Sequence, residues 1–255
     1  MLKKRIVGVI TVKNGWAVQS FGYSRHLPLG RPEVLAENLD RWGVDEIVVQ
    51  CIDRSHLGLG PDFGVIQRIG SLGLSTPLVY GGGIATVDHA RGVIEFGADR
   101  ICLDSSLWTD HSVIRAASAL LGAQALIGVL PLGVAHGELH WKNYLNGITQ
   151  RISDCDLSLF KDRVVSEALI VDWAHEGFPQ GFDLNLVTKF PLQDVPLITF
   201  GGLSHANQLR ELLSSSQVVA VAVGNFLSYR EHALQHYREQ LIDQPIRPAY
   251  FEDVL

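Results

Sequence analysis

Short segments of this chain recur in the same order at an interval of about 120 residues, close to half of its 255 residues. Ile6–Ile10 (IVGVI) recurs as Leu126–Leu130 (LIGVL), and Gly82–Ile84 recurs as Gly201–Leu203. Further pairs keep this order: Asp45-Glu46 with Ser166-Glu167, Pro77-Leu78 with Pro196-Leu197, and Leu103-Asp104-Ser105 with Val223-Gly224-Asn225. Chance similarity among strands is the alternative, and the shared order argues against it. We therefore expect two related halves.

Each half contains β-rich apolar runs separated by stretches with helical spacing, an alternation that builds a parallel sheet covered by helices. Residues 32–42 are an example, because Pro32 suits the first turn of a helix. The expected strands lie near residues 5–12, 45–51, 77–80, 99–104, 124–131, 167–172, 195–200 and 218–224. These strands predict an α/β fold, a (β/α)8 TIM barrel built from two repeated half-barrels. No Ser- or Pro-rich linker divides the chain, so residues 1–255 are expected to form a single domain.

Composition restricts the kinds of partner that such a barrel can have. Hydrophobic residues make up 47% and charged residues 19% of the chain, which permits a large core. The net charge of −6 and the lack of a long basic run argue against nucleic acid. No apolar run approaches the ~20 residues that a membrane helix needs, so no membrane partner is expected. Three cysteines without CxxC spacing suit a reducing compartment, and we predict a cytoplasmic location.

The sequence predicts neither a metal nor another cofactor. His136 and His140 could approach one another on a helix, but Gly133–His140 resembles a hairpin more closely than a helix. No Gly-rich dinucleotide fingerprint and no nucleophile–base motif is present either.

Two glycine-rich turns are candidate phosphate sites. Glycine lets backbone N–H groups approach an anion, and barrels place such sites at the carboxyl ends of their strands. The predicted phosphate-binding residues are Gly82, Gly83 and Ser105 in the first half, and Gly177, Gly201, Gly202, Gly224 and Asn225 in the second. Two such cradles imply a phosphorylated small-molecule substrate with two phosphate ends, whereas the alternative is that the glycines only close tight turns. Because an ionised Asp104 repels phosphate at the first cradle, the second cradle is the stronger candidate.

At this point the residues resemble the cyclase subunit of imidazole glycerol phosphate synthase and, more distantly, its isomerase relative, which are both half-barrel repeats with two phosphate sites. The resemblance covers nearly the whole chain and is closest to divergent paralogues found with surface-polysaccharide genes. It is carried by Lys3–Ile6, Val12–Gly15, Asp45-Glu46, Gly81–Ile84, Gly97–Arg100, Gly181–Asp183 and, for the paralogues, Tyr23–Pro32. It implies a glutamine amidotransferase complex, in which a separate glutaminase supplies ammonia to the barrel.

The resemblance also implies an ammonia entrance at the amino-terminal face of the barrel. The family's ring of charges at this entrance falls on Arg5, Glu46, Arg100 and Glu167, and Asp99 lies on the same partner face. Charges of alternating sign can compensate one another when they are partly buried, so the alternative is a purely structural layer of salt bridges.

The acid and base that the resemblance implies are absent. The family's aspartates at the ends of strands 1 and 5 fall on Thr11 and Pro131, which cannot exchange a proton near neutral pH. Gln19 and Cys51 replace a lysine and a further aspartate, and Ala174–Gly177 replaces an Asp-Arg-Asp-Gly segment. Orthodox cyclisation is therefore not expected.

Other side chains at strand ends could supply new chemistry, although each could equally serve as a capping, loop or core residue. The catalytic candidates are Cys51, Asp104, His175 and Glu176.

Three functions remain open at the level of the sequence. The leading hypothesis is a divergent synthase subunit that receives ammonia from a glutaminase and acts on a phosphorylated or nucleotide-linked sugar. The second is a true imidazole glycerol phosphate synthase cyclase of histidine biosynthesis. The third is a catalytically silent barrel that binds a phosphate ligand or acts as a scaffold for its glutaminase.

Overall fold

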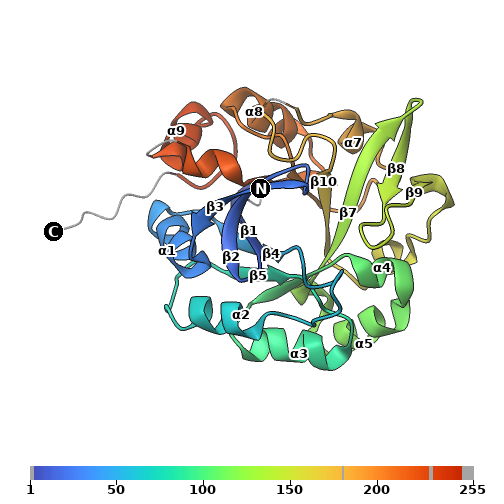
Figure 1. The fold of residues 1–255 in the computed structure, drawn as a ribbon. Helices are drawn as coiled ribbons and strands as arrows, with labels where there is room; N and C mark the ends of the chain where they lie inside the picture. The colour runs from blue at the N-terminus through green and yellow to red at the C-terminus, as the bar shows by residue number, and fades with distance from the viewer. Residues whose placement is uncertain (1–2, 180, 230–231, 249–255) are drawn as a thin grey trace.

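Parallel strands form a closed barrel in the computed structural model, which describes residues 3–179, 181–229 and 232–248 (Figure 1). The barrel strands in this described part of the chain are β1 (Arg5–Lys13), β4 (Glu46–Cys51), β5 (Leu78–Gly81), β6 (Arg100–Leu103), β7 (Leu126–Ala135), β10 (Glu167–Asp172), β11 (Leu197–Phe200) and β12 (Val218–Val223). Their hydrogen-bonded order is β10-β11-β12-β1-β4-β5-β6-β7, and the pairing of β7 with β10 closes the ring. The predicted α/β barrel is confirmed, and each expected strand is present.

Helices surround the barrel, as Figure 1 shows. The α-helices of the described residues are α1 (Pro32–Trp42), α2 (Phe63–Gly70), α3 (Val87–Glu95), α4 (Ser105–Thr109), α5 (His111–Leu121), α6 (Ser158–Lys161), α7 (Asn185–Thr188), α8 (Ala206–Ser214) and α9 (Ala233–Gln240). Short 3₁₀ turns are η1 (Ala123–Ala125), η2 (Ile152–Asp154) and η3 (Asn225–Ser228). The helices after β7 and β10 are only one turn long, so the helical cover is thinnest there.

Helix α1 follows the sequence signals closely. Pro32 occupies its first turn, and Glu33 adds a negative charge that the amino-terminal end of the helix dipole favours. The helix ends at Gly43, whose φ of 78° permits its N–H to bond the Asp40 carbonyl. The predicted helix over residues 32–42 is confirmed.

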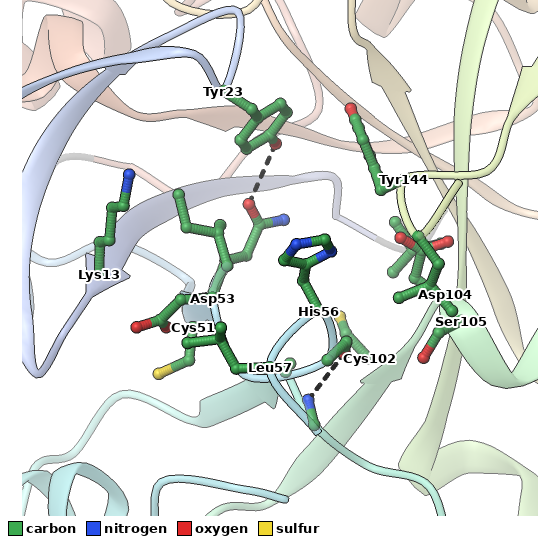
Figure 2. Close-up of a pocket in the computed structure, with 18 of the residues that line it drawn as sticks. Lys13, Tyr23, Cys51, Asp53, His56, Leu57, Cys102, Asp104, Ser105 and Tyr144 are labelled. Carbon is green, nitrogen blue, oxygen red and sulfur yellow. Dashed lines mark hydrogen bonds between the residues drawn. The ribbon is translucent and has the colours of Figure 1, made fainter. Parts of the chain in front are cut away.

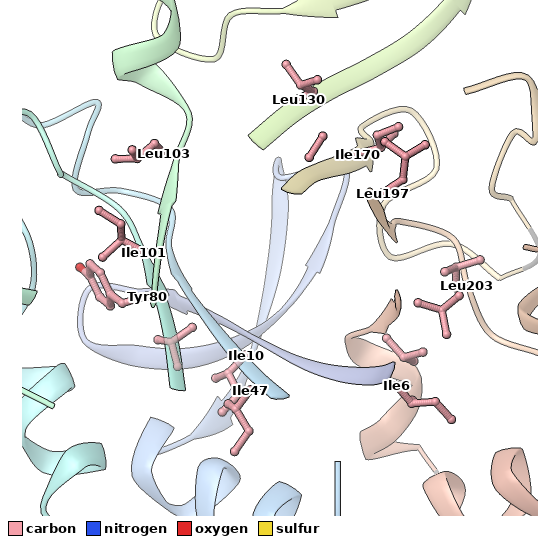
Figure 3. Packing of buried hydrophobic residues seen from close by; sticks show 14 of the residues in the cluster. Ile6, Ile10, Ile47, Tyr80, Ile101, Leu103, Leu130, Ile170, Leu197 and Leu203 are labelled. Carbon is pink, nitrogen blue, oxygen red and sulfur yellow. The ribbon is translucent and has the colours of Figure 1, made fainter. Parts of the chain in front are cut away.

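Alternating side chains divide the core into two clusters. On β1, Val7 and Val9 point into the barrel, whereas Ile6 and Ile10 pack outward against the helices. Figure 3 shows this outer packing, which Leu130 and Leu197 continue around the barrel. The apolar interior fixes the strand register, because a shift by one residue would exchange the two faces.

Strands β1 and β7 both extend beyond the barrel and fold back as antiparallel excursions. After β1 come β2 (Trp16–Phe21) and β3 (Arg25–Gly30), and after β7 come β8 (Glu138–Lys142) and β9 (Thr149–Arg151). The hairpin expected within residues 133–140 is confirmed, since a two-residue turn at His136-Gly137 joins β7 to β8. The sequence interpretation missed β2, β3 and β9.

Candidate active site

A cavity of about 420 Å³ opens at the carboxyl ends of the barrel strands. It lies mainly over the first half of the barrel, where the ends of β4, β5 and β6 contribute Cys51, Gly81 and Cys102. Figure 2 shows side chains from the loops after these strands arranged around it. Polar groups gathered over an apolar base are typical of a small-molecule site.

Asp104 lies at the wall of this cavity, directly after β6 (Figure 2). Burial raises the pKa of Asp104 to about 7. Its Oδ1 atom is buried and makes no hydrogen bond within the described part of the chain. A carboxyl group of this kind is divided between its neutral and ionised forms at neutral pH, which suits an acid–base role.

Cys51 also lines the cavity but differs from Asp104 in its protonation. Burial raises the pKa of the Cys51 thiol to about 12. The thiol therefore stays protonated near neutral pH and is a weak nucleophile and a weak base. Cys102, deeper in the same cavity, likewise has a pKa raised to about 12 by burial.

A cationic group faces the cavity from the extended part of β1. The Nζ atom of Lys13 lies 3.2 Å from Nδ1 of His26. Burial, with Lys13 as a second cause, lowers the pKa of His26, so the imidazole is neutral near pH 7. Nearby, Asp53 accepts a hydrogen bond of 2.7 Å from the Asn14 N–H through its Oδ2 atom. Among the described residues, Lys13 is the one Lys or Arg side chain that lines this cavity.

Two tyrosines, which the sequence interpretation missed, cover the mouth of the barrel. Tyr23 follows β2 and Tyr144 follows β8, and their rings meet edge to face with centroids 5.3 Å apart. The Tyr23 hydroxyl donates to Gln50 Oε1 at 3.2 Å, as Figure 2 shows. The Tyr144 hydroxyl is buried without a hydrogen bond to any described residue. Tyr23 and Tyr144 lie about 120 positions apart, which equals the interval of the repeat, and this spacing is the sequence signal that could have identified them as a pair.

The first glycine cradle lies against this cavity. Gly82 and Gly83 have φ values of 131° and 71°, and a Cβ atom at Gly83 would lie 2.2 Å from the Gly60 carbonyl oxygen. Only glycine fits so close an approach. The Gly83 N–H donates to Ser55 Oγ at 3.0 Å, and Ser105 lines the cavity beside it. Of the predicted phosphate-binding residues, Gly82, Gly83 and Ser105 are therefore brought together beside open space.

The second glycine cradle encloses much less open space than the first. The predicted residues gather around a cavity of only about 10 Å³: Gly177, Gly201, Gly202, Gly224 and Asn225. The Glu176 side chain lines the same cavity, with only 2% of its surface exposed. Asn225 is held by the β2–β3 excursion, since its side chain exchanges two hydrogen bonds with the Ser20 backbone. Phosphate binding at this cradle stays a prediction.

The predicted catalytic residues are divided between the two halves of the mouth. Cys51 and Asp104 line the large cavity, whereas His175 and Glu176 are not among its lining residues. His175 lies 2.8 Å from the buried Asp172 through its Nδ1 atom, and Asp172 Oδ2 also accepts the Asp183 N–H. Burial raises the pKa of Asp172 despite these contacts. This His–Asp pair is a second polar group, outside the large cavity.

At the opposite end of the barrel, the charges form a closed ring of ion pairs. Arg5 contacts Glu46 at 3.2 Å and Glu167 at 2.5 Å, and Arg100 contacts the same carboxylates at 2.8 and 2.7 Å. Burial lowers the pKa of Arg100, but the Coulombic attraction of Glu167 and Glu46 outweighs this effect and leaves the pKa above its ordinary value. Asp99 is exposed beside the ring and accepts the Leu78 N–H at 2.8 Å. The predicted residues of this face are brought together.

Across residues 3–179, 181–229 and 232–248, no three His, Cys, Asp or Glu side chains gather closely enough to hold a metal ion. Within the same ranges, no helix is both long and apolar enough to cross a membrane.

Comparison with known proteins gives the chain relatives along most of its length. Residues 5–233 match the family model described as histidine biosynthesis protein. The chain is 28% identical over 239 residues to a Vibrio vulnificus protein with the provisional name imidazole glycerol phosphate synthase subunit hisF2, covering 91% of this chain and 86% of the relative. It is also 28% identical over 247 residues to the imidazole glycerol phosphate synthase subunit HisF of Lysinibacillus sphaericus, covering 94% and 97% of the two chains. The subunit HisF of Exiguobacterium sibiricum is 29% identical over 230 residues, covering 89% and 91%.

Proposed function

The chain belongs to the histidine biosynthesis protein family, and from this premise we propose that it is the barrel subunit of a glutamine amidotransferase complex. In this proposal a separate glutaminase docks at the amino-terminal face and supplies ammonia through the barrel. The ammonia reacts at the opposite mouth with a phosphorylated or nucleotide-linked sugar. All three cysteines are free, which fits a reducing compartment such as the cytoplasm.

The observation that carries this proposal is the placement of the charge ring opposite the large cavity. Between them the interior is lined by apolar side chains such as Val7, Val48 and Val79. About six residues of a strand at ~3.3 Å each separate the two ends by about 20 Å. Transfer of a charged ammonium ion through such an interior is disfavoured, because burial of an unpaired charge is costly, whereas neutral ammonia carries no such cost.

Asp104 is the strongest acid–base candidate for the proposed reaction. Its pKa, raised by burial to about 7, allows it to give or accept a proton near neutral pH. The cavity that it lines contains Lys13 to hold an anionic group and Ser105 to donate or accept a hydrogen bond. Cys51 has no comparable role, since its thiol stays protonated.

The alternative of a true imidazole glycerol phosphate synthase cyclase is less well supported. Thr11 and Pro131 stand where the family's acid and base are expected, and neither is among the residues that line the large cavity. A catalytically silent barrel is the second candidate function. The missing aspartates favour it, and the cavity and cradle allow ligand binding without chemistry.

Copurification with a glutaminase subunit from the same organism tests the proposal. Asp99→Asn is a sharper probe of the docking face than a charge reversal, because the amide oxygen can still accept the Leu78 N–H while the charge is lost. We expect the wild-type complex to form and the variant to bind about tenfold more weakly at low salt, with the difference diminishing at high salt. Arg91, an exposed residue on α3 away from the ring, offers an Arg91→Gln control for general charge effects.

Glutamine-dependent transfer to a supplied sugar substrate is measured separately from affinity. Failure of the wild-type protein to bind the glutaminase would remove the amidotransferase proposal. Binding without transfer would favour the silent barrel.

A further inference from the structure

The carboxyl group of Asp104 differs from the other buried carboxyl groups of the barrel, because the described residues supply it with no partner. Its Oδ1 atom is buried without a hydrogen bond to them, and burial alone accounts for its raised pKa. By contrast, Asp45, Asp172 and Glu176 each accept at least one hydrogen bond from a backbone N–H. A buried carboxyl group without a partner destabilises the fold, so its presence at a cavity favours a role in binding.

The hydroxyl group of Tyr144 is a second polar group of the same cavity that is buried without a partner in the part of the chain that the structure describes. The fold does supply partners to other tyrosines, since Tyr23 donates to Gln50 and Tyr80 accepts the Asp62 N–H at 2.7 Å. Burial, with the charge of Asp104 as a second cause, raises the pKa of Tyr144, so the two groups lie near one another. Figure 2 shows both on one side of the cavity, with Lys13 on the opposite side.

Strand β6 connects the charge ring to Asp104 along one side of the barrel interior. Side chains two residues apart on a strand point in the same direction. Arg100 belongs to the charge ring, Cys102 belongs to the apolar interior, and Asp104 follows at the mouth. Val129 and Val171 are likewise both part of the interior cluster and part of the cavity lining. A small neutral molecule that leaves the interior therefore emerges beside Asp104.

The two unpartnered groups suit a ligand that donates hydrogen bonds. An ionised Asp104 can only accept, and the Tyr144 oxygen can accept as well. Lys13 lies across the cavity, and no described cation contributes to the pKa of Asp104. A metal ion fits poorly, because no three His, Cys, Asp or Glu side chains gather closely enough to hold one within residues 3–179, 181–229 and 232–248. A nitrogen that brings its own N–H donors fits better.

We infer that Asp104 and Tyr144 form a site that receives ammonia where the barrel interior opens into the large cavity. In this site two N–H groups of ammonia donate to the Asp104 carboxylate and to the Tyr144 oxygen. The lone pair of the nitrogen then stays free to face a sugar substrate in the cavity. This inference rests on the proposed function and adds to it the residues that position the ammonia.

Ammonium chloride is the probe in solution, because ammonium carries the same N–H donors as ammonia. The carboxyl carbon NMR signal of Asp104 is followed against pH in the full-length protein. Ammonium that binds the ionised carboxylate should lower the observed pKa of Asp104, whereas sodium or potassium chloride at equal ionic strength should not. Tyr144→Phe should weaken ammonium binding about two- to tenfold, since one hydrogen bond is lost.

Asp53→Asn is the matched control in this titration. Asp53 lines the same cavity, and an amide oxygen at this position can still accept the Asn14 N–H. The response of Asp104 to ammonium should be unchanged in this variant. An equal response to ammonium, sodium and potassium would overturn the inference, and so would an unchanged affinity in Tyr144→Phe.

Crystals of the full-length protein soaked in methylammonium chloride at pH 8 give the position of the bound nitrogen. We expect it between Asp104 and Tyr144 in the wild type and in Asp53→Asn, and we expect the site to be empty of methylammonium in Asp104→Asn. Asp104→Asn should fold, because it removes a buried charge that has no partner among the described residues. Water alone beside Asp104 in the wild type, or methylammonium bound only elsewhere, would contradict the inference. Both measurements use the barrel chain alone, so a failure to bind the glutaminase would count only against the proposed function.

Discussion

Asp104 illustrates how one buried residue can combine a structural cost with a chemical use. Its carboxyl group lies at the cavity wall, where burial raises its pKa to about 7. Below that pH the neutral acid can donate a hydrogen bond to a phosphate oxygen, which removes the repulsion expected from sequence alone. The same residue is a candidate acid and base for the proposed reaction.

The raised pKa of Asp104 predicts a specific dependence of stability on pH. In the unfolded chain the carboxyl group ionises near 3.8, and in the folded chain it ionises near 7. Its favourable contribution is complete below about pH 4 and is lost as the pH rises to about 7. Asp104→Asn should therefore increase the free energy of unfolding at pH 8 by about 1–3 kcal/mol and have a smaller effect at pH 4.

Urea unfolding at the two pH values measures this difference. Asp194→Asn, at an exposed position before β11, is the control and should shift the free energy of unfolding by less than about 0.5 kcal/mol at either pH. Equal stabilisation of Asp104→Asn at pH 4 and pH 8 would exclude an elevated pKa.

Side chains at strand ends were predictable from the sequence, and side chains on the excursions were not. Asp104 and Cys51 follow apolar runs, and the carboxyl ends of parallel strands meet at one mouth. Tyr23 and Tyr144 lie on segments whose antiparallel pairing depends on contacts with the completed barrel. The sequence also did not show that the Glu176 side chain is buried, because its partners Ser20 and Tyr23 are distant in the sequence.

At the scale of elements, the glycine turns set how closely the loops approach one another. Gly83 lies in the loop after β5 and packs against the loop after β4. Its N–H donates a hydrogen bond to Ser55 Oγ. Gly73, after α2, has a similar φ of 67°, but a Cβ atom there would meet nothing within 4 Å. The two positions share a backbone conformation and differ in crowding.

This difference predicts the outcome of two alanine substitutions. Gly73→Ala should lower the free energy of unfolding by about 1 kcal/mol, because alanine strains a left-handed backbone. Gly83→Ala should lower it by more than about 2 kcal/mol, since the added Cβ also collides with the Gly60 carbonyl. Chemical denaturation of both variants provides the comparison. Similar losses would show that the loop after β4 moves aside readily and that the first cradle is not rigid.

For the whole molecule, the repeat gave enough information to predict the barrel but not the difference between its two halves. Both halves supply four barrel strands in the same order, and both extend their first strand into an antiparallel excursion. The excursions diverge in where they pack. The excursion after β1 contacts the second cradle through Ser20, which bonds Asn225, whereas the large cavity remains open over the first half.

The charge ring spans both halves, so its removal should affect the whole barrel. Glu46 contacts both Arg5 and Arg100 and is nearly buried. Glu46→Gln leaves the two arginines with one carboxylate between them, and the free energy of unfolding should fall by about 1–3 kcal/mol. Asp162→Asn, which breaks an exposed pair with Arg115, should cost less than about 1 kcal/mol. Thermal and urea unfolding compare the two, and equal effects would mean that the ring contributes no more than a surface pair.

The last prediction concerns the reaction of the intact protein. Supplied with ammonium salts and the two-phosphate substrate of imidazole glycerol phosphate synthase, the purified chain should not form imidazole glycerol phosphate at a rate comparable to its relatives. Thr11 and Pro131 cannot transfer the protons that the family's aspartates transfer, and each such transfer contributes on the order of 10²–10⁴-fold to the rate.

Added ammonium makes the assay independent of the glutaminase, so a missing partner cannot explain a negative result. The HisF subunit of Lysinibacillus sphaericus, assayed under the same conditions, is the positive control. Turnover within about tenfold of that control would contradict the prediction, because it would mean that other groups replace both aspartates at nearly full efficiency.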